Sequence, residues 1–385
     1  MKVRISAHGR FHAFSLAEGL NKLGVLEALQ TTYPAAYVKR QLRSNIPVRS
    51  VWPLELLKRS VAFVGGGQAL DPTISRLFAR ALARDVHHSN ADILVGWSSS
   101  TLEAIEIAHS KGMRVIIERG STHISHQTAV IENEYRTLGI DRKVTSEEII
   151  EREIAEYEAA DAICVLSNVA AKSFIEQGIS REKLIVNHLG VDVRRFGEMP
   201  RRADRTRKVR ILFTGIVGVR KGVNCLLQVM KKLSGNVELQ FAGNLSQEFK
   251  EISSSFNSEN VTFLGPVPRT KMTQLYRDAD IFVLPSIEEG FGMAVTEAMA
   301  AGLPVVVSDA VGAADILTSM KDGIIFPVNN VEALTDSLQS LIDQPALRLS
   351  MGHAAFTTAT SLGDWDDFAL RMRNAYQGLL ASNAG

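Results

Sequence analysis

The sequence predicts an α/β protein made of two doubly wound parallel sheets, one in each half of the chain, facing each other across a cleft. Three observations support this. Short apolar runs alternate with stretches of helical periodicity in both halves. The 385 residues are too many for one ordinary core. The composition, with 45% hydrophobic and 22% charged residues, is that of a globular protein. We therefore expect two domains that share the chain about equally.

The first domain is predicted over residues 1–198. Four apolar runs have the length and composition of buried parallel strands, and we expect them at Val3–Ser6, Ile93–Val95, Val115–Ile117 and Ala162–Leu166. Helical stretches separate these runs. The clearest of them follows Ser146 and continues to about Ala160, because Ser146 is a good N-cap and the acidic residues after it complement the helix dipole. This alternation predicts a doubly wound sheet.

The second domain is predicted over residues 199–364, after a polar, arginine-rich linker from Pro200 to Arg207. Its expected strands are Val209–Thr214, Val237–Phe241, Val261–Leu264, Ile281–Leu284, Pro304–Ser308 and Ile324–Phe326. In sheets of this kind, ligands bind beyond the carboxyl ends of the strands. The cleft between the two sheets is therefore the expected site.

The stretch from Pro285 to Val306 is the most informative part of the chain. It follows an apolar strand, continues through a loop that contains Gly290 and Gly292, and then becomes a run of strong helix formers that Gly302 can terminate. The start of such a helix presents unpaired backbone N–H groups and the positive end of the dipole, which favour an anion. The two loop glycines allow a ligand to approach the backbone closely.

Two carboxylates, Glu289 and Glu297, flank this predicted anion site. A carboxylate repels a phosphate but accepts hydrogen bonds from hydroxyl groups. A ligand with a phosphate centre and hydroxyl-rich groups on both sides is a sugar nucleotide. The alternative is a glycine-capped strand–helix unit with surface glutamates, and short motifs do arise by chance.

The pair stands as Glu-x7-Glu within Pro-Ser-Ile-Glu-Glu-Gly-Phe-Gly, followed by Glu-Ala-Met-Ala-Ala-Gly-Leu-Pro-Val-Val. This resembles the signature of the family 4 retaining glycosyltransferases, whose GT-B fold places two Rossmann-like domains across a cleft. Further segments match the family, at Asp161–Ser167, Gly190–Asp192 with Phe196, Lys221–Gly222 and Val261–Gly265. Trp365 and the apolar positions after it resemble the family's terminal helix, so residues 365–385 are expected to pack back on the first domain.

The resemblance implies a retaining, metal-independent hexosyltransferase without a cofactor. Such an enzyme moves a sugar from a nucleotide-diphosphate donor to a hydroxyl of a glycan or a lipid-linked acceptor, in polysaccharide or glycolipid assembly. Two alternatives stay open, a phosphorylase- or epimerase-like enzyme of the same fold and a sugar-nucleotide-binding protein without transferase activity. No Asp-x-Asp element stands where the fold would need a metal.

The resemblance also implies the roles of individual residues. Glu289 is expected to bind the hydroxyls of the transferred sugar, and Glu297 those of the ribose. Arg220 and Lys221 open a helix, where cations oppose the dipole unless an anion binds, so we expect both at the diphosphate. The expected catalytic residues are Glu289, His123, Arg220 and Lys221. The expected donor-binding residues are Gly9, Gly215, Arg220, Lys221, Gly265, Val267, Glu289, Gly290, Phe291, Gly292, Met293, Ala294 and Glu297.

The chain departs from the family in the cleft-facing loops. The family often has an arginine after the glycine that is Gly215 here, but this chain has Ile216, and Arg220 is the expected substitute. Family members also often carry a histidine just after the strand that contains Ile117. Glu118 takes that place, and His123 is the favoured histidine, with His126 next and a purely structural role for His123 as the alternative. Near Gly9, the neighbours Arg10, Phe11 and His12 replace the usual second glycine.

A basic and apolar segment runs from Val38 to Ser60 and contains a single acid, Glu55. It suits contact with an anionic membrane, as a lipid-linked acceptor would require, although an ordinary solvated basic face fits equally well. The N-terminus starts directly with a strand, so we expect a cytoplasmic protein that can act at the inner membrane surface. The net charge of +1 and the lack of a recognition motif around Arg201–Arg207 argue against nucleic-acid binding.

Overall fold

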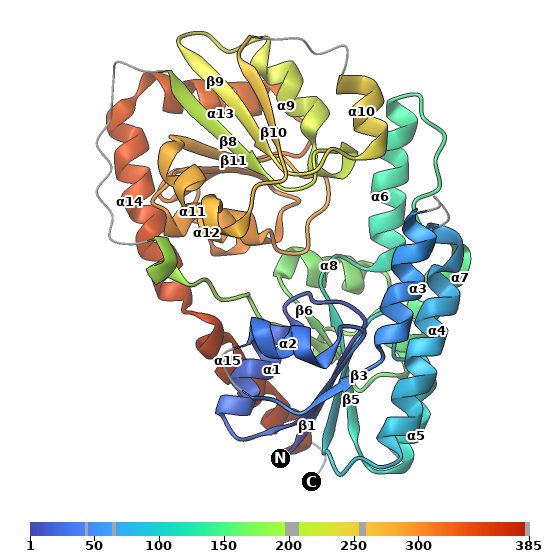
Figure 1. Ribbon diagram of the computed structural model, residues 1–385. Coiled ribbons are helices and arrows are strands. Elements are labelled where there is room, and N and C mark those ends of the chain that lie inside the picture. Colours follow the sequence, from blue (N-terminus) through green and yellow to red (C-terminus); the bar gives the residue numbers. More distant parts are fainter. Residues whose placement is uncertain (43–44, 64–66, 197–207, 254–258, 382–385) are drawn as a thin grey trace.

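A computed structural model describes residues 1–42, 45–63, 67–196, 208–253 and 259–381. Two parallel sheets with helices on both faces form an upper and a lower body in Figure 1. The predicted linker Pro200–Arg207, like the predicted boundary between residues 198 and 199, lies outside the described residues. The α/β prediction with two doubly wound sheets is confirmed.

The first sheet has seven parallel strands in the order β3-β2-β1-β4-β5-β6-β7. The strands are β1 (Val3–Ala7), β2 (Leu26–Thr31), β3 (Val48–Ser50), β4 (Ile93–Trp97), β5 (Arg114–Arg119), β6 (Ala162–Val165) and β7 (Leu184–Val186). Chain order reverses between β1 and β4, so the loops after these two strands diverge and leave a crevice at the carboxyl edge of the sheet.

The second sheet has six parallel strands in the order β10-β9-β8-β11-β12-β13. They are β8 (Val209–Thr214), β9 (Val237–Ala242), β10 (Val261–Gly265), β11 (Ile281–Leu284), β12 (Val305–Ser308) and β13 (Gly323–Phe326). Here the order reverses between β8 and β11. The carboxyl ends of both sheets point into the space between the two bodies, which is where the site was expected (Figure 1).

Helices cover both sheets. In the first body they are α1 (Ala13–Lys22), α2 (Ala35–Gln41), α3 (Trp52–Phe63), α4 (Gly67–Val86), α5 (Leu102–Ser110), α6 (Ile124–Thr137), α7 (Glu147–Ala159) and α8 (Asn168–Glu176). In the second they are α9 (Val223–Met230), α10 (Gln247–Ser253), α11 (Arg269–Asp278), α12 (Met293–Ala300), α13 (Val331–Asp343) and α14 (Pro345–Leu362). The helix predicted after Ser146 is α7, and the Ser146 hydroxyl accepts from the Ile149 amide at its start.

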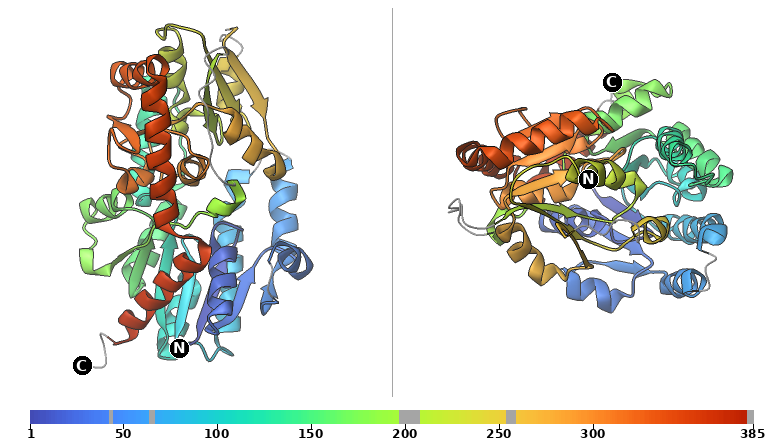
Figure 2. Two further views of the ribbon diagram at one scale, coloured as in Figure 1. Left: turned by 90° about the vertical axis from the view of Figure 1, so that its left-hand side faces the viewer. Right: turned by 90° about the horizontal axis from the view of Figure 1, so that it is seen from above.

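The chain returns to the first body at its C-terminal end. The last helix, α15 (Trp365–Ala381), continues below α14 and packs along α1, as the left view of Figure 2 shows. A Cβ on Gly19 of α1 would lie 2.3 Å from Cβ of Ala369, so the two helices approach closely because this position is glycine. The returning segment at Asp364 lies against Gly190, so both crossings between the bodies run side by side. The right view, which looks down from above, shows the second body lying over the first (Figure 2).

Candidate active site

The loop that joins β11 to α12 is held by the loop after β12. The Glu289 amide donates to the carbonyl of Ala310 at 3.2 Å, and the Gly312 amide donates to the carbonyl of Glu289 at 2.9 Å. Gly292 then begins α12 with φ +93°, a left-handed conformation that side chains rarely adopt. The first residue of α12, Met293, lines a cavity between the two bodies, and the first amides of a helix are the ones that can bind an anion.

Lys221 and Glu289 form an ion pair. Lys221 lies in the connection between β8 and α9, and Glu289 lies in the connection between β11 and α12. Gly222 makes this contact possible, because a Cβ there would lie 1.8 Å from the carbonyl oxygen of Pro285. Both side chains are largely buried. Burial, followed by the charge of Arg220, lowers the pKa of the Lys221 ammonium, whereas Glu288 favours its charged form. A cation that is poorly hydrated in this way gains from an anionic ligand.

Arg220 contacts residues at the boundary between the two bodies, and its expected role at a diphosphate stays a prediction. Its Nε donates to the Glu288 carboxylate at 2.7 Å, and its Nη2 donates to the Ser121 hydroxyl of the first body at 3.1 Å. Glu288 in turn accepts from the Thr122 amide at 3.0 Å and from the Gln127 amide group at 3.0 Å. The guanidinium that was expected to replace the missing arginine at position 216 therefore joins the two bodies.

Glu288 is the residue that sequence reasoning missed. It is 1% exposed, and burial alone would raise the pKa of its carboxyl group. The positive charge of Arg220 and the hydrogen bonds from Thr122 and Gln127 outweigh burial and lower that pKa to about 2. The carboxylate is therefore ionised, and it accepts hydrogen bonds from Thr122 and Gln127 of the first body and from Arg220 of the second. The available signal was an acidic residue beside Glu289 in a loop whose other residues are apolar or small.

Glu297 closes a pocket of about 380 Å3 in the second body. Its carboxylate accepts from the Tyr276 hydroxyl at 3.1 Å, which is itself 2.9 Å from the Thr214 hydroxyl. Arg195 approaches the other carboxylate oxygen at 3.3 Å. The predicted donor-binding residues that line this pocket are Gly215, Val267, Ala294 and Glu297. The pocket begins at the ends of β8, β9 and β10 and includes Glu297, the residue that is expected to bind the ribose.

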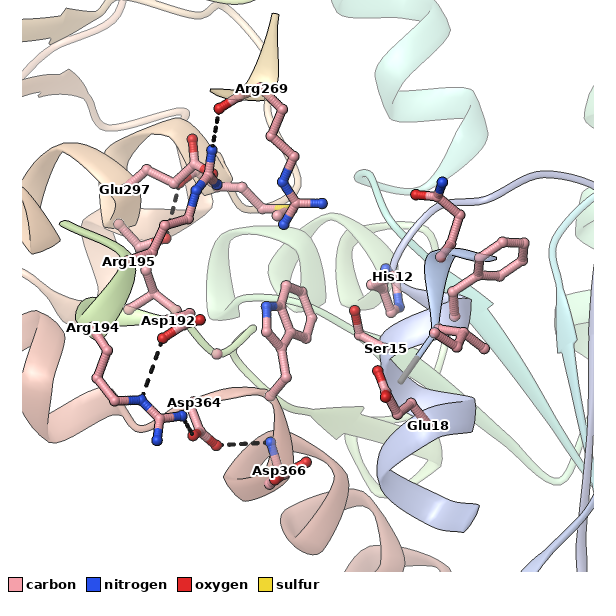
Figure 3. A pocket seen from close by; sticks show the side chains of 18 of the residues that line it. His12, Ser15, Glu18, Asp192, Arg194, Arg195, Arg269, Glu297, Asp364 and Asp366 are labelled. Atoms are coloured by element: carbon pink, nitrogen blue, oxygen red, sulfur yellow. Dashed lines mark hydrogen bonds and ion pairs between the residues drawn. The ribbon is translucent and has the colours of Figure 1, made fainter. Parts of the chain in front are cut away.

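A larger cavity of about 520 Å3 lies between the two bodies and shares Glu297 with the first pocket. In Figure 3, His12 on one side of this cavity faces Arg195, Arg269 and Glu297 on the other. Met293, at the first turn of α12, also lines the cavity. The cavity is therefore bounded by the loop between β1 and α1, by the crossing segments and by α12.

The remaining residues predicted to bind the donor lie in two kinds of place. Gly290 and Phe291 lie at the contact between the bodies, whereas Gly265 and Gly9 lie beside the two cavities. A Cβ on Gly290 would lie 2.2 Å from the carbonyl oxygen of Gly120, and the Ser167 hydroxyl donates to the Gly290 carbonyl at 2.7 Å. Phe291 is 1% exposed and its ring stacks on His188. Gly265 accepts from the Gly243 amide at 2.8 Å, beside the nucleoside pocket. Gly9 lies in the loop after β1, directly before Arg10, Phe11 and His12, which are among the residues that line the larger cavity.

His123 is buried in the first body and is not among the residues that line the cavity, while its expected catalytic role stays a prediction. It is 3% exposed, and its ring packs against Tyr157 and Phe174 with centroid distances of 5.1 and 5.0 Å. Its Nδ1 accepts from the Ser125 amide at 3.2 Å, which caps α6. Burial, with smaller contributions from Arg119 and His126, lowers the pKa of His123 to about 4. His126 lies on the first turn of α6.

The Lys221–Glu289 ion pair lies at the loop before α12 and Glu297 lies within α12; of these three residues, Glu297 lines the two cavities described above. Among the described residues, no group of three or more His, Cys, Asp or Glu side chains could hold a metal ion. Within the same part of the chain, no helix has the length and apolar character to cross a membrane. Cys164 and Cys225 are buried free thiols.

Comparisons with known proteins agree with this geometry. Residues 198–358 match the model of the family described as glycosyl transferases group 1. A D-inositol 3-phosphate glycosyltransferase of Pseudarthrobacter chlorophenolicus is 26% identical over 317 residues, 78% of this chain and 72% of that protein. The sulfoquinovosyl transferase of Arabidopsis thaliana is 29% identical over 232 residues, 57% of this chain but only 44% of that longer protein.

Solved structures share the whole architecture. Sucrose-phosphate synthase of Thermosynechococcus elongatus superposes with a TM-score of 0.73 at 17% identity and covers 100% of both chains. HepE of Anabaena, solved in complex with UDP and glucose, has a TM-score of 0.70 at 14% identity, covering 98% of this chain and 100% of that one. The two-domain fold is therefore GT-B, and residues 198–358 are similar to the glycosyl transferases group 1.

Proposed function

We propose that this protein is a retaining, metal-independent glycosyltransferase that moves a sugar from a nucleotide diphosphate to a hydroxyl of a glycan or lipid-linked acceptor. One observation carries the proposal. Glu289 and Glu297 lie at the two sides of the start of α12, where Lys221 and the helix amides provide positive charge. This order of hydroxyl acceptor, anion site and hydroxyl acceptor matches the order of sugar, diphosphate and ribose in a sugar nucleotide.

The nucleoside is assigned to the pocket of the second body. Its base would lie near Val267 and Gly215, and its ribose hydroxyls would donate to Glu297, which Tyr276 and Arg195 already orient. The diphosphate would contact the amides at the start of α12 and the Lys221 ammonium, which would exchange its contact with Glu289 for the ligand. Glu289 would then be free to accept from the hydroxyls of the transferred sugar.

Transfer breaks the bond between the anomeric carbon and the phosphate oxygen, and the electron pair leaves with the diphosphate. Lys221 and the helix amides would stabilise that developing charge, a preorganised electrostatic role that requires no metal. The acceptor oxygen forms the new bond on the same face of the sugar, and its proton leaves with the diphosphate. This route keeps the anomeric configuration.

A binding screen tests the donor. Thermal unfolding would be followed with UDP-, GDP-, ADP- and dTDP-sugars, each with and without EDTA, and UDP-glucose is the first to try because HepE was solved with UDP and glucose. A ligand of the folded state raises the midpoint by mass action. We expect one donor to raise it in both conditions. A shift that EDTA removes would contradict metal independence, and no shift with any donor would contradict the assigned pocket.

For the acceptor, the first body offers a separate cavity of about 540 Å3. It lies beyond the carboxyl ends of β1 and β4, where His8 and Ser99 line it, and Lys58 and Asp71 contribute charge from α3 and α4. Polar and charged groups of both signs suit a hydroxylated, carbohydrate-like ligand. We assign the acceptor to this side of the cleft.

A membrane-facing surface would bring lipid-linked acceptors to this cavity. Over residues 38–60, Trp52 and Leu56 are 49% and 55% exposed, and Lys58 stands beside them on α3. The one acid, Glu55, is engaged by Arg59 at 2.9 Å and by Thr32 at 2.9 Å. Apolar side chains with neighbouring cations suit an anionic bilayer. Flotation with vesicles of phosphatidylglycerol should carry the protein, and Trp52→Ser with Leu56→Ser should abolish this. Equal flotation of the double variant would contradict the surface.

A further inference from the structure

Glu118 on β5 is a buried carboxylate that the mechanism above does not use. Its side chain is 0% exposed, and its Oε2 lies 3.2 Å from Nε2 of His12, a residue that precedes it by more than a hundred positions. A carboxylate without water is costly unless an ionic or hydrogen-bonding partner compensates. The pairing with His12 is therefore a specific feature, and it joins the loop after β1 to the end of β5.

Two titratable neighbours of Glu118 are Cys164 on β6 and Tyr376 on α15. Burial, followed by the charge of Glu118, raises the pKa values of both the thiol and the phenol well above their usual range, and the Cys164 thiol also hydrogen-bonds Glu118. Both groups therefore stay neutral, and the His12 ring is the neighbour of Glu118 that also reaches the cavity between the bodies.

His12 itself lines the large cavity between the bodies. It is 7% exposed, and its ring is held between Trp97 and Phe368 with centroid distances of 5.0 and 5.9 Å. Because Nε2 is occupied by Glu118, Nδ1 is the ring nitrogen left for a ligand. No hydrogen bond to Nδ1 occurs within the described part of the chain. Figure 3 shows His12 at the edge of the cavity opposite Glu297.

We propose that His12 contacts a sugar hydroxyl in the cleft through Nδ1, and that Glu118 is the residue that positions its ring. This rests on the proposed function. When Nε2–H donates to the carboxylate, Nδ1 keeps its lone pair and accepts a hydrogen bond from a hydroxyl. The hydroxyl belongs either to the transferred sugar or to the acceptor. Glu118 occupies the strand end at which the family resemblance led us to expect a histidine. In this chain the histidine, His12, would come from the loop after β1 instead.

Two isosteric substitutions separate this contact from a structural role. In His12→Asn the side-chain oxygen lies near the former Nδ1, whereas in His12→Gln the terminal group reaches toward the former Nε2 and Glu118. Asparagine is also a favourable residue at the start of α1. We expect His12→Ala and His12→Gln to lose about 10- to 100-fold in kcat/KM, the effect of one buried hydrogen bond, and His12→Asn to recover most of it. His109→Asn, on an exposed histidine, is the matched control.

Glu118→Gln tests the positioning role with less risk to folding. The amide oxygen can accept from Nε2–H, and the amide NH2 can instead donate to an unprotonated Nε2, so the ring is no longer held in one tautomer. We expect kcat/KM to fall about tenfold while the midpoint of thermal unfolding stays near that of the wild type. KM for donor and for acceptor, together with hydrolysis of UDP-glucose in the absence of acceptor, identifies the hydroxyl. A change in hydrolysis points to the donor sugar, and a change in acceptor KM alone points to the acceptor.

The outcomes are distinguishable. If the wild type releases nucleotide diphosphate and all His12 variants match it, the inference is overturned and the proposed function stands. If His12→Gln is more active than His12→Asn, the role is structural pairing with Glu118, which also overturns the inference. If the wild type releases no nucleotide diphosphate from any donor of the panel, the proposed function fails and the inference with it.

Discussion

The two bodies carry their candidate site residues in different ways. In the second body, Glu289 and Glu297 come from one loop and the helix that follows it, so the distance between them is set by local structure. In the first body, His12 and Glu118 come from the ends of two strands that are not neighbours in the sheet. A sequence motif can describe the first arrangement because its residues lie within one short stretch. The second arrangement forms only when distant strands assemble into the sheet. Sequence patterns therefore describe the donor side of a GT-B cleft better than the acceptor side.

The same contrast separates the two cations of the second body. Lys221 and Arg220 are adjacent in sequence and looked equally suited to a diphosphate. Lys221 contacts Glu289 beside α12, whereas Arg220 contacts Glu288 and the first body. Two neighbouring residues of like charge thus make different contacts, and we expect them to serve ligand binding and domain contact separately. The predictions below follow this division, from the largest expected effect to the smallest.

Glu289→Gln should reduce kcat/KM for sugar transfer by about 100- to 1000-fold, because a neutral amide oxygen is a weaker acceptor for the sugar hydroxyls than the carboxylate and cannot stabilise positive charge that develops on the sugar. Release of nucleotide diphosphate measures the effect. Glu332→Gln, on an exposed residue of the same body, is the matched control and should match the wild type. Wild-type turnover in Glu289→Gln would remove this residue from the site.

Glu288→Gln should act on stability. It leaves the Arg220 guanidinium without its carboxylate at the contact between the bodies, which should cost about 2–3 kcal/mol in the free energy of unfolding. Urea unfolding, analysed beside the same Glu332→Gln control, measures this difference. A stability equal to the wild type would show that Glu288 does not join the two bodies.

Lys221→Met should weaken nucleotide-diphosphate binding about tenfold, the contribution of one charge-assisted contact. Arg220→Met, which loses the contacts with Glu288 and Ser121, should lower the unfolding midpoint but change nucleotide affinity much less. Titration of both variants with UDP compares them directly. If Arg220→Met lost more affinity than Lys221→Met, the assignment of the two cations would have to be exchanged.

The pH dependence of stability should report on Glu288 as well. Its pKa is lowered from 4.5 to about 2 in the folded protein, so the folded state binds its proton less readily than the unfolded state. The stabilisation is fully present above about pH 4.5 and is lost as pH falls toward 2, by at most about 1.4 kcal/mol per pH unit. Unfolding free energies measured from pH 5 to 3 should fall more steeply for the wild type than for Glu288→Gln. Parallel curves would contradict the lowered pKa.

Much of the fold was predictable, since buried parallel strands are continuous apolar runs. The predicted bounds of β8 and β11 coincide with those in the structure. Three strands were missed. The strand β2 mixes Glu27, Gln30 and Thr31 with its apolar residues, and β3 and β7 have three residues each. Runs that short or that polar carry no periodicity of their own, and they are strands because neighbouring strands pair with them.

The site was predictable only where it is local. The loop glycines and the two carboxylates around α12 stand out in the sequence because they belong to one continuous loop–helix segment. The burial of His123 was not predictable, because proximity in sequence to β5 does not show that its ring packs against Tyr157 and Phe174. The bonds from Thr122 to Glu288 and from His12 to Glu118 span 166 and 106 positions. No pattern in one sequence encodes such pairs.

The most direct test of the account is the product of the reaction. The protein would be incubated with its best donor of the panel and a carbohydrate acceptor in the presence of EDTA, and proton NMR would follow the anomeric signals of donor and product. We predict release of nucleotide diphosphate and a product with the same anomeric configuration as the donor. A product of inverted configuration would contradict the retaining mechanism, and no release despite donor binding would identify a sugar-nucleotide-binding protein instead of a transferase.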